Sequence, residues 1–111
     1  MRNVYWIKAA DKDFRKFPKA VQETIHDALA IAAEGQKADI AKPMKGLGSG
    51  IFEIALPYQT NAYRAIYAVQ LGEDIWVVHA FQKKSKTGIK TPQQNIDLVK
   101  ERLMRLKEML K

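Results

Sequence analysis

Residues 75–85 read IWVVHAFQKKS, and this stretch decides the expected fold. Apart from His79, its first part is apolar at odd and even positions alike, which is typical of a strand covered on both faces. Lys83 and Lys84 then end the run, and no acidic residue occurs from 75 to 96. The sequence therefore predicts a strand in the middle of a sheet that leads into a basic segment.

Two other runs with strand chemistry, 51–56 and 62–70, precede this strand, and short turn-like segments separate the three. Three such runs in succession predict an antiparallel meander. A further short run at 3–9 is rich in β-branched and aromatic residues, as strands are. Residues 36–50, before the meander, are expected to form a loop.

Helical patterns flank the meander on both sides. Before it, a short helical segment carries Phe14 and Phe17, and a longer helix follows that should end at Gly35. The apolar positions of the longer helix are Val21, Ile25, Ala28, Leu29 and Ala32. After the meander, residues 91–94 (TPQQ) have the pattern of a capping box with proline at the first helical position. This last helix has an apolar seam of Ile96, Val99, Leu103, Leu106 and Leu110.

The resulting order, β-α-α-β-β-β-α, predicts an α+β fold. We expect a small antiparallel β-sheet with two N-terminal helices and one C-terminal helix packed against it, the seam of the last helix facing the sheet. At 111 residues the chain is most simply one domain, spanning 1–111.

The charge of the chain indicates what it binds. The formal net charge is +7 and the pI about 9.7, which favours a polyanionic partner such as nucleic acid, or an acidic protein. Residues 61–111 hold ten basic and five acidic side chains, so the excess is concentrated there. The absence of cysteine excludes disulfides and thiolate metal sites and suits a reducing cytoplasm. We find no signal peptide and no apolar run long enough for a membrane span.

The histidines and glycines do not form a recognisable metal or nucleotide site. His26 and His79 lie far apart in sequence, and neither belongs to a cluster with metal-ligand spacing. His79 is more typical of a hydrogen-bonded core histidine than of a base, but it shares a strand face with Phe81 and Lys83. The glycine-containing segment 45–50 matches neither a phosphate loop nor a dinucleotide fingerprint, because a strand follows it and not a helix.

The basic cluster is the strongest functional signal. In a hairpin of 62–70 with the next strand, Arg64 lies opposite Phe81 or Gln82, within reach of Lys83 or Lys84. Arginine binds phosphate through a planar fork, lysine adds point charge, and rings such as Tyr63 and Phe81 can stack on unpaired bases. We therefore expect phosphate binding at one exposed edge of the sheet.

Several motifs of the chain resemble a known family. The residues that carry the resemblance are Leu47–Glu53, Tyr63-Arg64-Ala65-Ile66-Tyr67, the run His79–Ser85, and Thr91-Pro92 leading into a basic helix. In this order they resemble the phage-derived, HigB-like branch of the RelE/ParE toxin superfamily over nearly the whole chain. The run FQKKS followed by Thr-Pro is more specific to this branch than the aromatic-Arg-x-Ile-Tyr strand.

The resemblance implies the toxin of a type II toxin–antitoxin system: a cytoplasmic, metal-independent endoribonuclease without cofactors that cuts translated mRNA on the ribosome. Its partners would be the ribosome, mRNA and a small antitoxin, expected to be of the helix-turn-helix type. In such enzymes the RNA 2′-hydroxyl attacks the adjacent phosphate and leaves a 2′,3′-cyclic phosphate. The candidate catalytic residues are Arg64, Lys84, Lys83 and His79; of these, Arg64 and Lys84 match basic positions of the family, and Lys83 lies beside Lys84. The candidate RNA or phosphate contacts are Lys86, Lys90, Tyr63, Phe81 and Lys45.

One departure from the family pattern leaves an alternative open. Many relatives carry a basic residue in the strand after the glycine segment, where this chain has Glu53 and Ala55. Glu53 or His79 could serve as the base instead. The alternative function is a binding protein: a ParE-like inhibitor of a protein target such as gyrase, or a catalytically inert relative.

Overall fold

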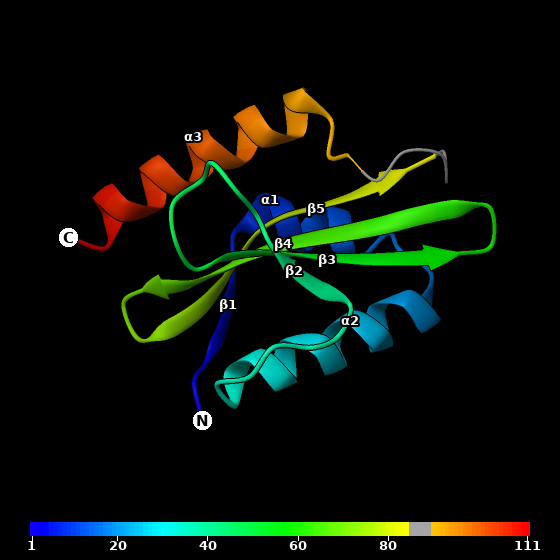
Figure 1. Cartoon of the computed structure of the whole chain (residues 1–111), viewed down its shortest axis with the longest axis horizontal. Coiled ribbons are helices and arrows are strands. Elements are labelled where there is room, and N and C mark those ends of the chain that lie inside the picture. Colours follow the sequence, from blue (N-terminus) through cyan, green and yellow to red (C-terminus); the bar gives the residue numbers. More distant parts are fainter. Residues whose placement is uncertain (85–89) are drawn as a thin grey trace.

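A five-stranded sheet lies between helices in the computed structural model, which describes residues 1–84 and 90–111 (Figure 1). The strands are β1 (Val4–Trp6), β2 (Ala41–Pro43), β3 (Ile51–Tyr58), β4 (Asn61–Leu71) and β5 (Asp74–Lys83). The helices are α1 (Lys8–Phe14), α2 (Lys19–Ala33) and α3 (Gln93–Met109). The predicted α+β fold, with two N-terminal helices and one C-terminal helix, is confirmed.

The strand order in the sheet is β1-β5-β4-β3-β2. The meander β3-β4-β5 is antiparallel, as predicted, and β5 lies inside the sheet. The sheet is nevertheless mixed, because β1 pairs with β5 in parallel, with Val4 opposite Ile75. The second difference is β2, which lies in the predicted loop 36–50 and pairs with β3. A strand of three residues is too short to show a periodic pattern.

The two faces of the sheet are covered by different helices. Side chains alternate along β4, so Tyr63 and Tyr67 join the cluster under α2, whereas Ile66 and Ala68 join the cluster under α3. In β5 the register shifts where Tyr67 pairs with Val77 and Ile66 with His79. Residue 78 is the extra residue of this irregularity.

The apolar seams predicted for the two long helices pack against the sheet. All five predicted positions of α2 are buried, and the helix ends at Ala33 before Gly35, whose φ of +87° stops it. In α3, Val99, Leu103 and Leu106 are buried against the sheet, but Leu110 lies beyond the helix and is 43% exposed.

The start of α3 differs from the predicted capping box. Pro92 is the N-cap residue, and no side chain caps the helix. The hydroxyl of Thr91 donates instead to Glu53 of β3, with Oγ1 and Oε2 2.6 Å apart. The prediction was wrong here because a capping threonine must accept from a backbone N–H of the first turn, whereas the Thr91 oxygen accepts from Nη1 of Arg64 and its hydroxyl donates to Glu53.

Candidate phosphate-binding site

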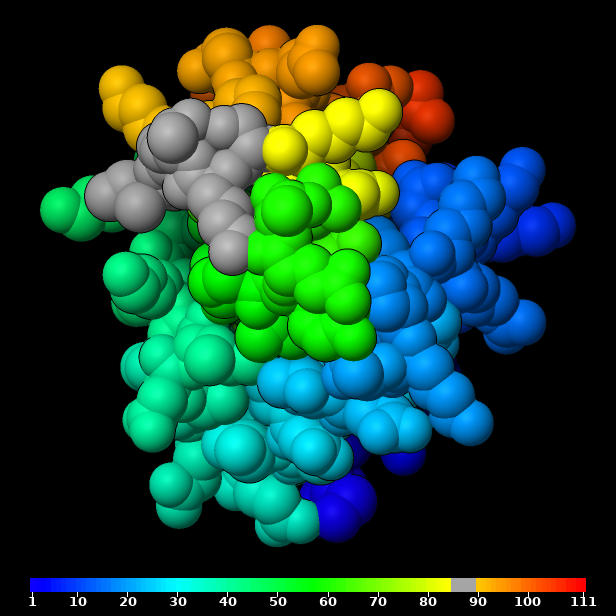
Figure 2. Space-filling view, turned by 90° about the vertical axis from the view of Figure 1, so that its right-hand side faces the viewer, coloured from blue at the N-terminus to red at the C-terminus, as the bar shows by residue number. Residues whose placement is uncertain are grey.

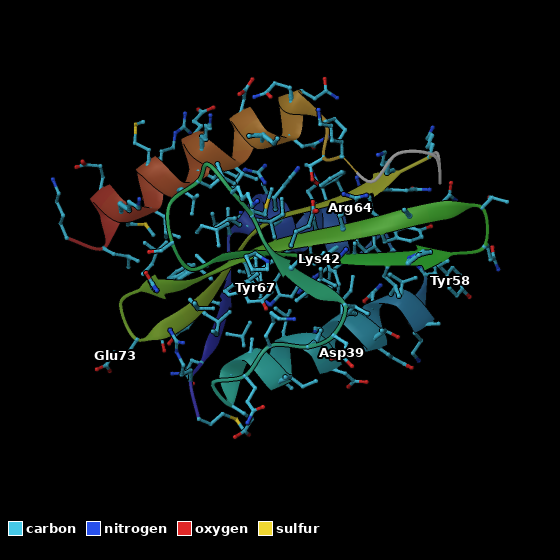
Figure 3. All side chains as sticks on the ribbon, in the orientation of Figure 1. Asp39, Lys42, Tyr58, Arg64, Tyr67 and Glu73 are labelled. Carbon is cyan, nitrogen blue, oxygen red and sulfur yellow. The ribbon has the colours of Figure 1, made fainter. Side chains whose placement is uncertain are left out.

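Arg64 lies on the face of β4 that α3 covers (Figure 3). The register places it opposite Phe81 of β5, which is one of the two positions expected from the hairpin. The prediction of an exposed sheet edge was wrong, because β4 lies between β3 and β5 and Arg64 is only 5% exposed. A charged group at this depth requires a charged or hydrogen-bonding partner.

Glu53 supplies the negative charge that the basic segment lacks in sequence. Its Oε1 accepts a hydrogen bond from Nη1 of Arg64 at 3.1 Å, and its Oε2 accepts one from the hydroxyl of Thr91. Nη1 of Arg64 also lies 3.3 Å from the Thr91 oxygen. These three side chains come from β3, β4 and the residue before the N-cap of α3, and they form one network on the sheet face.

Sequence reasoning did not find this network, although part of its signal was present. Arg64 is paired with Ala55 across β3 and β4, so Glu53 lies two residues along on the same face. An arginine side chain is long enough to reach from position 64 to this diagonal neighbour on β3. Thr91, in contrast, carried no such signal, because its pattern favoured helix capping.

The lysines lie around the same end of the sheet. Figure 2 shows the end of β5, the β3–β4 hairpin and the start of α3 together on one face of the molecule. Lys84 and Lys90 are exposed, and Nζ of Lys83 donates to the carbonyl of Lys90 at 2.9 Å. Lys86 lies outside the described residues.

His79 is buried and engaged at both ring nitrogens. Nδ1 lies 3.1 Å from Nη1 of Arg102, and Nε2 lies 2.7 Å from Oδ1 of Asn95. Because an arginine can only donate, Nδ1 is the acceptor and Nε2 carries the proton. Burial lowers the pKa of His79 and so favours this neutral form, while the Asn95 hydrogen bond opposes the shift and the charge of Arg102 adds to it.

The two aromatic rings expected at the site are separated by the sheet. Phe81 is half-buried and stacks on His79, with ring centroids 5.0 Å apart. Tyr63 lies on the opposite face, with its ring 4.8 Å from that of Phe17. Lys45 is exposed in the segment that joins β2 to β3. Alternation along a strand makes Tyr63 and Arg64 point in opposite directions.

The described part of the chain holds no group of three or more His, Cys, Asp or Glu side chains that could bind a metal ion. Nor does any helix in residues 1–84 and 90–111 have the length and apolarity needed to cross a membrane. The side chains found at the site are cations, one carboxylate and hydroxyl or amide groups.

A family model described as "Phage derived protein Gp49-like" matches residues 12–104, which is most of the chain. The chain belongs to the Gp49-like family. A search of curated proteins found no match.

Solved structures of RelE toxins have the same fold. A double arginine-to-alanine mutant of E. coli toxin RelE in the free state has a TM-score of 0.63 and 18% identity, with 94% of this chain and 96% of that chain covered. The isolated E. coli RelE toxin gives 0.60 and 20%, over 91% and 98% of the two chains. The RelB–RelE antitoxin–toxin complex from Methanococcus jannaschii gives 0.54 and 18%, over 78% and 99%. With the Gp49-like match, these structures confirm the predicted RelE-like superfamily.

Proposed function

We propose that this Gp49-like chain is the toxin of a type II toxin–antitoxin system and that it cuts translated mRNA on the ribosome. The observation that carries the proposal is the position of Arg64. Its guanidinium already binds the carboxylate of Glu53, near the end of β5 that carries Lys83 and Lys84. Groups that hold a carboxylate in this way also suit a phosphate. The RelE-like fold supports the same function.

The proposed reaction needs a proton acceptor, and Glu53 fits this role better than His79. In RNA cleavage the 2′-oxygen forms a bond to phosphorus, the bond from phosphorus to the 5′-oxygen breaks, and the 2′-hydroxyl proton passes to a base. The carboxylate of Glu53 lies beside the phosphate-binding arginine. Both ring nitrogens of His79 are already hydrogen bonded, so we place His79 in a positioning role beneath Phe81.

The remaining charges complete the reaction. Arg64 and Lys83 stabilise the negative charge that develops on the phosphate oxygens, since fixed cations cost no reorganisation during the reaction. The departing 5′-oxygen takes a proton from the ammonium of Lys84, and the proton that Glu53 gained then passes through water to Lys84, which restores both groups. The exposed face of Phe81 is available for a base to stack on, and Lys90 binds the adjacent backbone phosphate.

The proposed partner that holds the toxin inactive is an antitoxin with an acidic contacting segment. One of the similar structures is a toxin bound to its antitoxin. The formal charge of +7 makes an acidic partner favourable, because complementary fields speed association. We expect co-expression with a small adjacent gene product to restore growth of the host. The two proteins should form a complex in the cytoplasm and co-purify.

Primer extension on total RNA tests the proposed activity. Induction of the protein should give new 5′ ends within a translated reporter mRNA, and an otherwise identical reporter without a start codon should remain intact. The upstream fragments should end in a 2′,3′-cyclic phosphate. Uncut reporter at an expression level that arrests growth would exclude the nuclease and leave a binding protein.

A further inference from the structure

The anion-binding site at Arg64 is occupied from within the chain. Oε1 of Glu53 accepts the hydrogen bond from Nη1 of Arg64, and the side chains of the two residues are 13% and 6% exposed, respectively. Glu53 is thus the more exposed partner. A phosphate that reaches this part of Arg64 must compete with the carboxylate, because both anions use the same kind of contact.

We propose that phosphate binding at Arg64 is an exchange, in which the incoming phosphate replaces Glu53 at Nη1 and Thr91 retains the displaced carboxylate at the site. The exchange deepens the proposed function and rests on it, since it concerns the same arginine. It also explains how one carboxylate can first neutralise Arg64 and then accept a proton. Release from the guanidinium leaves Oε1 free to accept the hydrogen of a 2′-hydroxyl.

Thr91 is placed to hold Glu53 during the exchange. Its hydroxyl donates to Oε2, whereas Arg64 donates to Oε1, so the two contacts lie on different oxygens of the carboxylate. Loss of the Arg64 contact therefore leaves the Thr91 contact in place. Thr91 acts on the reaction through Glu53, which makes it a positioning residue.

The position of Thr91 is itself fixed by α3. Asn95 in the first turn bonds to Nε2 of His79, and Val99 and Leu103 are buried against the sheet. Because these contacts do not involve Arg64, they can persist when phosphate binds. The sheet thus supplies the carboxylate that exchanges, and Thr91, just before the N-cap of α3, supplies the hydroxyl that holds it.

The exchange predicts opposite changes in binding and cleavage when Glu53 loses its charge. In Glu53→Gln the neutral amide competes less well for Arg64, so a phosphate binds more tightly, but the proton acceptor is gone. We expect the affinity for a single-stranded RNA with 2′-O-methyl groups, which cannot react, to rise about tenfold. Cleavage of the unmodified RNA by ribosome-bound protein should fall at the same time.

Glu101→Gln is the matched control. Glu101 lies exposed on α3 and pairs with Arg105, so its substitution makes the same change in net charge away from Arg64. Fluorescence anisotropy with the 2′-O-methyl RNA should show the large gain for Glu53→Gln alone. Adding Arg64→Met should abolish that gain. If Glu53→Gln binds no more tightly than Glu101→Gln, the exchange is wrong.

Thr91 is tested by a conservative pair of variants. Thr91→Ser keeps the hydroxyl and should cleave as the parent does. Thr91→Val keeps the shape without the donor, and should lower kcat while the 2′-O-methyl RNA binds at least as well. Amide exchange of α3 in both variants shows whether the helix stays docked. Equal kcat for Ser and Val would remove Thr91 from the proposal.

One measurement needs no variant and is independent of cleavage. In the parent protein, the carboxyl ¹³C resonance of Glu53 should shift when the 2′-O-methyl RNA is added, while the amide resonances of α3 stay in place. An unchanged Glu53 resonance at saturating RNA, or no RNA binding at all, would overturn the exchange. A shift with intact cellular mRNA would keep the exchange and reject the nuclease, whereas cut mRNA with an unchanged resonance would do the reverse.

Discussion

Arg102 of α3 donates a hydrogen bond to Nδ1 of His79 in β5, with the two nitrogens 3.1 Å apart. The same Nη1 of Arg102 also donates to the carbonyl of Val78 at 2.9 Å. One guanidinium therefore ties α3 to two successive residues of β5, at the point where the register shifts. The contact depends on a neutral imidazole, because a protonated Nδ1 would face the arginine with a second donor.

This relationship predicts that stability falls in mild acid. The pKa of His79 is lowered in the folded protein, chiefly by burial, so between that pKa and the unfolded value near 6.5 the unfolded chain binds more protons. The stabilisation is thus fully present above the unfolded pKa and is lost progressively as the pH falls from about 6.5 towards the lowered pKa of the folded protein. Urea unfolding midpoints at pH 7.5 and 5.5 should show this loss. His79→Gln should reduce the dependence, whereas exposed His26→Gln should retain it.

Arg64→Ala should destabilise the protein as well as abolish the proposed activity. It leaves the carboxylate of Glu53 poorly compensated, and loss of one partner of a buried ion pair costs about 3–5 kcal/mol. Chemical denaturation measures this cost. Adding Glu53→Gln should recover part of it. If the double variant is less stable by the sum of the two single effects, the two side chains are not coupled in folding.

Lys84→Ala should weaken RNA binding through charge. Lys84 is exposed at the end of β5, so its loss should leave stability nearly unchanged. If it contacts a phosphate, the slope of log K against log salt should fall by about one unit. The matched control is Lys107→Ala, which should keep the parent slope because Lys107 is exposed in the last turn of α3, away from Lys84. Identical slopes for both variants would return Lys84 to the role of a solvated surface residue.

Two neighbouring positions test how α3 packs. Leu103 is 4% exposed and belongs to the cluster under α3, whereas Met104 is 68% exposed. Leu103→Ala should lower the free energy of unfolding by about 2–5 kcal/mol, because it removes buried methyl groups and leaves a cavity. Met104→Ala should change it by no more than about 0.5 kcal/mol. A large effect at Met104 would mean that the outer face of α3 is covered, for example by a second molecule.

The parts of the fold that were predictable are those with a local pattern. The spacing of the apolar positions predicts α2 and α3, and the turn-like segments predict the hairpins of the meander. The parallel pairing of β1 was not predictable, since its partner Ile75 lies far along the chain and neither strand encodes the direction of pairing. The sequence favoured an antiparallel sheet only because the three strands of the meander, β3, β4 and β5, follow one another along the chain.

The site was predictable to a similar degree. Hairpin geometry placed Arg64 opposite Phe81 or Gln82, and a hydrogen-bonded core histidine was the more typical interpretation of His79. The depth of Arg64 was missed, because burial of an arginine depends on a partner that β3 supplies. The role of Thr91 was missed because its local pattern favoured helix capping, whereas its hydroxyl makes a tertiary hydrogen bond to Glu53.

The long-range pairing of β1 also determines when the molecule can be completed during synthesis. The N-terminus leaves the ribosome first, but Val4–Trp6 find their neighbours only when Ile75–Val77 have emerged. Closing so long a loop is slow compared with forming the hairpins. Thr91 reaches Glu53 later still. A nascent chain therefore lacks the complete surroundings of Arg64 until most of α3 has been made, and a truncated translation product would be an incomplete protein at the position where the proposed chemistry occurs.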